Sequence, residues 1–149
     1  MEAEVYPEPR VDRLVRENFL PVRIPVRGNP GAMERWNVQW TPTIVLVGAD
    51  GKEHHRIEGF LEADDFLAQL HLGLGHVAFA AKDWESAGKH FEEVLERFPS
   101  SDAAPEAQYW RGVTRYKASN DPAALGATAK AFQERYADST WAKKASIWG

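Results

Sequence analysis

The side chains able to do chemistry are five histidines and 22 acidic residues, with no cysteine among the 149 residues. The lack of cysteine excludes disulfides, thiolate metal sites and a cysteine nucleophile from this chain. His54 and His55 are neighbours, so on a strand they point to opposite faces and cannot hold one ion together. Asp64 and Asp65 stand where a helix is expected to start, a position that suits carboxylates because of the helix dipole. No histidine pair has the HExxH spacing. We therefore predict no catalytic residue, no metal site and no cofactor.

Composition sets limits on the class of protein. The chain is 44% hydrophobic and 27% charged, which is ordinary for a globular protein. A net charge of −4 argues against a general nucleic-acid binder, which would carry a basic face. No window reaches the roughly 18 apolar residues of a membrane span, and the N-terminus lacks a secretory signal. We expect no nucleic acid or membrane partner and, by default, a cytoplasmic location; a periplasmic one stays open if the true N-terminus lies upstream.

The secondary structure expected from the sequence changes near residue 66. Before it lie nearly all the strand-like runs, and after it the pattern is helical and rich in alanine. PRVDRLVREN predicts a short amphipathic helix with Pro9 at its first position. NPGAMERWNV predicts another brief helix, and TIVLV an interior strand covered on both faces. The Asp50-Gly51 pair predicts a hairpin turn that returns through EHHRIEGF. A further helix is expected from about Ala63.

The run FLPVRIPV has the alternation of a strand, with Leu20, Val22, Ile24 and Val26 on one face. Pro21 and Pro25 are separated by an even number of residues, so their missing N–H groups fall on the same side. This predicts an edge strand with one usable side.

The order helix, strand, helix, strand, hairpin strand, helix resembles the C-terminal part of a thioredoxin-like domain over about residues 1–72. The stretches that carry the likeness are WTPT, VLVGADGK and RIEGF. The positions that match the family are Thr41, Pro42, Gly51 and Gly59. The resemblance implies a cis bond between Thr41 and Pro42, and a peptide-binding edge at Trp40, Thr41 and Pro42. It also implies a redox family, because the first residues are similar to those that follow a CxxCxxM motif in many bacterial members.

The chain departs from that family because it starts after the first core strand and the CxxC motif. The absent strand normally lies between the strands expected at 19–26 and 43–47. Buried unpaired backbone groups cost about 1–3 kcal/mol each. We therefore expect the gap to be closed, either by direct pairing of those two strands or by a strand from another chain, which leaves a homo-oligomer open.

The second half contains a repeat. FPSSDAAPEAQYW and YADSTWAKKASIW superpose with a shift of 38 residues, which is typical of a helical solenoid. The segment from about residue 70 resembles tetratricopeptide repeats. The positions matching its consensus, taken as structural, are Gly75, Ala87, Phe91, Pro99 and Gly112. We expect about two helical hairpins with Thr140–Trp148 as a capping helix. The predicted division is therefore 1–72 for a truncated thioredoxin-like domain and 73–149 for repeats. The predicted fold class is α+β or α/β for the first part, followed by an all-α array.

Three functions are compatible with these features. The first is a non-catalytic adaptor that binds a protein or peptide whose identity the sequence does not give. The second is a thioredoxin-family disulfide oxidoreductase whose CxxC lies upstream of Met1, which reading the DNA upstream would test. The third is a purely structural oligomeriser. Of these, the adaptor is the main prediction for the chain as written.

Overall fold

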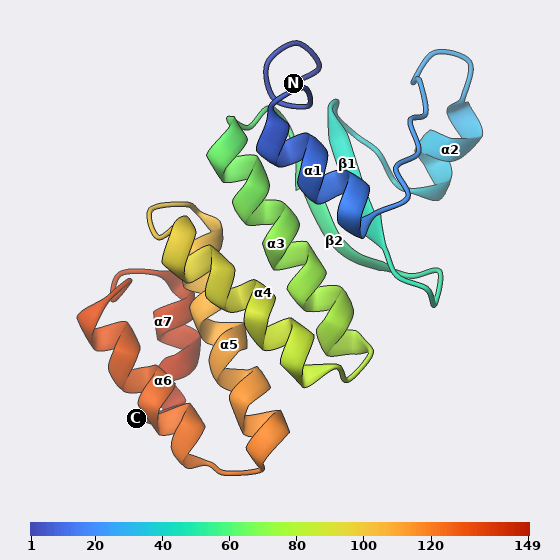
Figure 1. The fold of residues 1–149 in the computed structure, drawn as a ribbon. Helices are drawn as coiled ribbons and strands as arrows, with labels where there is room; N and C mark the ends of the chain where they lie inside the picture. The colour runs from blue at the N-terminus through green and yellow to red at the C-terminus, as the bar shows by residue number, and fades with distance from the viewer. The chain divides into compact units, whose positions relative to one another are not determined.

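A computed structural model describes all residues, 1–149, which form two compact units, residues 1–67 and 68–149. The first unit contains the helices α1 (Pro9–Asn18) and α2 (Pro30–Arg35), the strands β1 (Thr43–Val47) and β2 (Glu53–Glu58), and the start of α3 (Ala63–Ala80). The second contains the rest of α3, then α4 (Trp84–Arg97), α5 (Ala103–Ser119), α6 (Ala123–Glu134), α7 (Thr140–Ala145) and a closing 3-10 turn (Ser146–Trp148). The order of these elements can be followed in Figure 1.

Helix α1 forms as the sequence predicts, with Pro9 as its first residue. The Glu8 carboxylate caps it by accepting hydrogen bonds from the N–H groups of Arg10 and Val11 at 3.1 and 3.2 Å. Val11 is buried and anchors the helix to the core of the first unit. The core residues of this unit are Val5, Val11, Leu46, Ile57, Phe66 and Leu67.

The expected hairpin is confirmed as a two-stranded antiparallel sheet of β1 and β2. Ile44 lies opposite Ile57 and Leu46 opposite His55, with a bulge between Leu46 and Val47. The turn needs Gly51, whose φ of +76° is unfavourable for other residues. The Gly48 N–H then donates to the Lys52 carbonyl at 3.0 Å. The hairpin is therefore fixed in register by its turn.

Two expectations about this sheet are wrong. Residues 19–26 form no strand: they run without regular hydrogen bonding and lie outside the sheet, so they do not pair directly with β1. Strand β1 is also not an interior strand covered on both faces, because only Leu46 is buried and Val47 is exposed. The two findings have one physical reason. A strand is stabilised by hydrogen bonds to a neighbouring strand, and no segment of the chain lies between residues 19–26 and β1 to pair with them.

The second unit is wholly helical. Helix α4 packs against α5, α5 against α6, and α6 against α7, which gives the successive antiparallel neighbours seen in Figure 1. Asp83 caps α4 by accepting a hydrogen bond from the Ser86 N–H at 3.2 Å. The helices approach closely where small residues face large ones. The buried small residues at these contacts include Ala87, Ala103, Ala104 and Ala107.

The 38-residue repeat predicted from the sequence recurs in the hydrogen bonds. The Ser101 N–H and hydroxyl both donate to the Phe98 carbonyl, at 3.1 and 2.7 Å. The Ser139 N–H and hydroxyl donate to the Tyr136 carbonyl at 3.0 and 2.7 Å. Arg97 lies over the Phe98 ring just as Arg135 lies over the Tyr136 ring. The two turns therefore share these contacts, although their backbones differ: φ is −129° at Phe98 and +65° at Tyr136.

Candidate functional site

The hydrogen bonds of the hairpin show which residues of β1 direct their backbone groups toward β2 and which direct them to the other edge. The Gly59 N–H donates to the Pro42 carbonyl at 2.8 Å, so Pro42 and Gly59 form a hydrogen-bonded pair. In an antiparallel ladder such pairs alternate, so Ile44 and Leu46 also direct their backbone groups toward β2. The backbone N–H and C=O groups of Thr43, Val45 and Val47 therefore point to the opposite side, where no strand lies.

The two outer edges of the hairpin differ in chemistry. The outer edge of β2 carries Arg56 and Glu58, with Glu53 at its start, and Arg56 makes ion pairs with both glutamates. Charged side chains of this kind protect an edge strand against pairing with another chain. The outer edge of β1 carries Thr43, Val45 and Val47 and no charge. Only β1 therefore offers an unprotected edge for strand addition.

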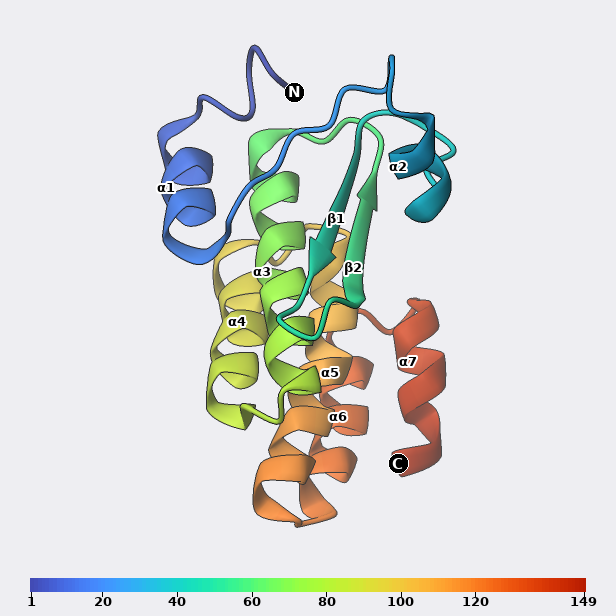
Figure 2. The ribbon, with the colours of Figure 1, turned by 90° about the vertical axis from the view of Figure 1, so that its right-hand side faces the viewer.

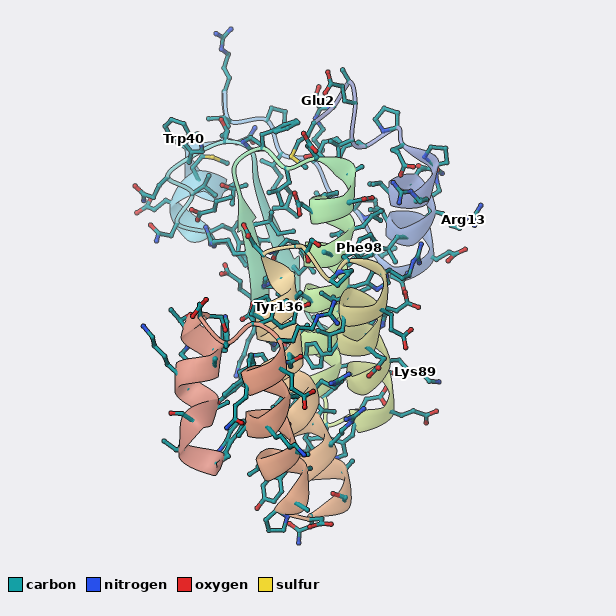
Figure 3. All side chains as sticks on the ribbon, turned by 90° about the vertical axis from the view of Figure 1, so that its left-hand side faces the viewer. Glu2, Arg13, Trp40, Lys89, Phe98 and Tyr136 are labelled. Carbon is teal, nitrogen blue, oxygen red and sulfur yellow. The ribbon has the colours of Figure 1, made fainter.

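A hollow of about 260 Å³ opens at the start of β1. Its lining residues are Val26, Met33, Val38, Gln39, Trp40 and Thr41. Trp40 is 69% exposed, which is unusual for so large an apolar side chain, and Figure 3 shows it at the surface beside α2. The peptide bond between Thr41 and Pro42 is cis, as expected. Of the predicted peptide-binding residues, Trp40 and Thr41 line this hollow, and the Pro42 carbonyl is held by Gly59.

Arg56 positions this loop, a role that the sequence did not suggest. Its guanidinium donates to the Trp36 carbonyl and, at 3.3 Å, to the Asn37 carbonyl, just past the end of α2. It also binds Glu53, and this hydrogen bond lowers the pKa of the Glu53 carboxyl. The loop that leads to Trp40 is thereby tied to β2. No local pattern could reveal a contact between residues 20 positions apart.

The segment of residues 19–26 also exposes apolar side chains. Leu20 is 97% exposed and Val22 is 81% exposed, and Ile24 and Val26 are exposed as well. The backbones of Leu20, Val22 and Ile24 make no hydrogen bond to other residues. In Figure 2 this segment climbs from the end of α1 while β1 descends, so the two run in opposite directions. An apolar stripe and an unpaired strand edge thus belong to the same unit.

Comparison with known families agrees with this architecture. Residues 1–73 match the family model of a thioredoxin-like domain, and residues 72–140 match that of a tetratricopeptide repeat. The chain thus has a thioredoxin-like domain followed by a tetratricopeptide repeat segment. Searches of curated proteins and of solved structures found no match. The resemblance and the fold class inferred from the sequence are confirmed, while the predicted boundary between residues 72 and 73 stays a prediction.

The consensus positions of the tetratricopeptide repeat segment occupy close contacts in the helical unit. A Cβ atom on Gly75 would overlap the ring of Phe91, and one on Gly112 would overlap the side chain of Thr128. Ala87 and Phe91 are fully buried. The Pro99 carbonyl accepts a hydrogen bond from the Tyr136 hydroxyl at 2.6 Å, joining the two repeated turns. Tetratricopeptide repeats generally mediate contacts between proteins, which supports a protein partner of unspecified identity.

Several titratable side chains pair with one another. The hydrogen bond from the Lys52 N–H, and then the bond to His54 at 3.0 Å, lower the pKa of the Asp50 carboxyl. His71 and His90 lie with their Nδ1 atoms 3.2 Å apart. Burial, and then the neighbouring His90, lowers the pKa of His71 to about 4. No group of three or more metal-ligating side chains comes together, and no helix is long and apolar enough to cross a membrane.

Proposed function

We propose that this protein is a non-catalytic adaptor that binds an extended segment of a partner protein at β1 and the adjoining hollow. The observation that carries the proposal is the free edge of Thr43, Val45 and Val47, which continues into a hollow walled by an exposed Trp40. An extended peptide adds to an exposed edge through its backbone and gains specificity from pockets for its side chains. The edge and the hollow supply these two elements.

A non-catalytic role is supported by the absence of cysteine, because thiol–disulfide exchange needs a thiolate and this chain has none. The helical repeats add a second scaffold of a class that binds proteins. Protein binding is a function that both units could share: the thioredoxin-like unit without thiols and the repeat unit. Neither unit needs a cofactor for it.

The test is a selection of random peptides displayed on phage against the immobilised full-length protein. Affinities of the selected peptides are then measured by fluorescence anisotropy. We expect Trp40→Ala to weaken binding by at least 10-fold, because buried Trp anchors commonly contribute 2 kcal/mol or more. The matched control is Ile147→Ala, which removes an 83% exposed apolar side chain from the helical unit and should leave affinity unchanged. Failure to select any peptide, or equal binding to Trp40→Ala, would refute the proposal.

A further inference from the structure

We infer that α7 and the 3-10 turn after it exchange between two copies of this chain, so that residues 140–149 of one molecule dock on α5 and α6 of the other. The exchange concerns the helical unit alone and is a property beyond peptide binding. Two features of that unit point to it: a strained turn before α7, and a docking surface that the turn does not share.

The backbone is strained at Tyr136, in the turn between α6 and α7. Its φ of +65° lies in the left-handed region, which a bulky side chain rarely adopts. Phe98, the matching residue one repeat earlier, stands before α5 with an ordinary φ of −129°. Both residues are labelled in Figure 3. Of the two repeated turns, only the one that leads into α7 is therefore strained.

Hydrogen bonds hold this turn in its strained form. The Tyr136 hydroxyl donates to the Pro99 carbonyl at 2.6 Å, and the Gln108 amide donates to the Arg135 carbonyl at 3.3 Å. A strained backbone persists only where its surroundings over-determine it. When the turn opens, these two bonds are lost but the strain is released, so the gain offsets part of the loss.

The docking surface under α7 is formed by side chains outside the turn. On α5, the Tyr109 ring stacks on Trp148 with the ring centroids 4.9 Å apart, and its centroid lies 5.2 Å from that of Trp141. On α6, the Cβ atom of Ala129 lies 3.3 Å from where a Cβ atom on Gly149 would be. None of these contacts involves the turn. The same contacts can therefore form when α7 and the 3-10 turn come from a second molecule.

The structure itself identifies the occupant of this surface, because α7 already lies on it. An exchanged α7 regains each of these contacts, and such exchange is a low-cost route to a dimer. Short hinges under strain favour it. The hinge runs from the end of α6 at Glu134 to the start of α7 at Thr140. Its residues 135–139 span roughly 17 Å when extended, more than the spacing of about 8–10 Å between packed helices.

The chain contains no cysteine, so two introduced cysteines report the exchange directly. Ala129→Cys and Gly149→Cys are made in separate full-length proteins, one carrying a tag that adds mass. The two proteins are unfolded together in urea, refolded at high concentration and oxidised. We expect a disulfide between the two different molecules, because the Cβ separation of 3.3 Å is near the mean of about 3.8 Å in disulfides.

The matched control is Gly88→Cys mixed with Thr114→Cys. These positions are neighbours on α4 and α5, which keep their turn and do not exchange. The control pair should crosslink within one chain that carries both substitutions, but at least 10-fold less between molecules than the pair at positions 129 and 149.

Light scattering at low and high protein concentration then measures the association constant. Tyr136→Phe removes the hydroxyl bond and keeps the strain, so the constant should rise about 5-fold for each of the two hinges, the effect of one net hydrogen bond. Tyr116→Phe, on α5, is the control and should leave the constant unchanged. Insertion of three glycines after Ala137 relieves the strain and should lower it.

The outcomes decide between exchange and other forms of association. Dimers joined by a disulfide between position 129 of one molecule and position 149 of the other support exchange. Dimers that lack this disulfide associate through another surface and overturn it. A strict monomer in the parent protein and in Tyr136→Phe at every concentration overturns it as well. The selection of peptides tests the proposed function independently of these results.

Discussion

His71 on α3 and His90 on α4 face each other through their Nδ1 atoms at 3.2 Å, with His71 only 8% exposed. At this distance one imidazole donates and the other accepts, so the accepting ring must be neutral and the two rings cannot both be protonated. Burial lowers the pKa of both groups, and the charged residues that act on the pair are Asp83, Glu93 and Arg97. The contact between α3 and α4 is thus sensitive to protonation.

The first prediction concerns pH. Because the folded-state pKa of His71 is about 4 and the ordinary value is 6.5, the unfolded chain binds protons first as the pH falls. Stability is therefore complete above about pH 6.5 and declines toward pH 4, by about 3 kcal/mol at 1.36 kcal/mol per pKa unit. Urea unfolding at pH 7.0, 5.5 and 4.5 measures this. The double variant His71→Phe, His90→Phe should lose most of the decline, whereas His54→Asn should retain it; equal slopes in all three proteins would refute the assignment.

The second prediction concerns close packing between helices. Gly75→Ala and Gly112→Ala should each destabilise the protein by about 1–3 kcal/mol, because the new methyl group overlaps Phe91 or Thr128. Gly88→Ala is the matched control, since a Cβ atom there would meet only the Thr114 side chain, at an ordinary contact distance of 3.9 Å. Alanine is a better helix former than glycine by up to about 1 kcal/mol, so Gly88→Ala should be neutral or stabilising. Thermal unfolding compares the three, and a uniform effect would contradict the packing argument.

The third prediction compares the same substitution at two valines. Val11 is 1% exposed and Val22 is 81% exposed. Val11→Thr should cost about 1–3 kcal/mol because it buries a hydroxyl group. Val22→Thr should leave the unfolding free energy within about 0.5 kcal/mol, as is usual for a surface position. Chemical denaturation measures both, and a large loss at Val22 would show that residues 19–26 pack against the rest of the chain.

The fourth prediction concerns Arg56. Arg56→Lys keeps the charge but removes the planar fork that reaches both the Trp36 and Asn37 carbonyls. We expect the loop before Trp40 to loosen, with a change in tryptophan fluorescence and a several-fold loss of peptide affinity. Lys89→Arg, on an exposed i,i+4 pair of α4, is the conservative control. Unchanged affinity in Arg56→Lys would show that the hollow does not depend on this anchor.

Local signals in the sequence predicted most of the elements. Pro9 marks the start of α1, and Asp50-Gly51 marks the hairpin turn, because each acts on its own backbone. The prediction of a strand at residues 19–26 was wrong because alternation is a property of one segment, whereas a strand also needs hydrogen bonds to a neighbouring strand. The sequence named Trp40 and Thr41 but not Met33 or Val38, which join the hollow only through folding of α2 and its loop. The contact between His71 and His90 was also missed, since it depends on how two helices pair.

The uncharged outer edge of β1 has a consequence for the life of the protein in a cell. An edge that carries Val45 and Val47 without a charge to guard it is a template for edge-to-edge association. If the proposed partner covers this edge, molecules made in excess of that partner should accumulate in aggregates or be degraded, and the abundance of the protein should follow that of the partner. Under that proposal, Val45→Lys is expected to remove this dependence and to weaken binding of the partner.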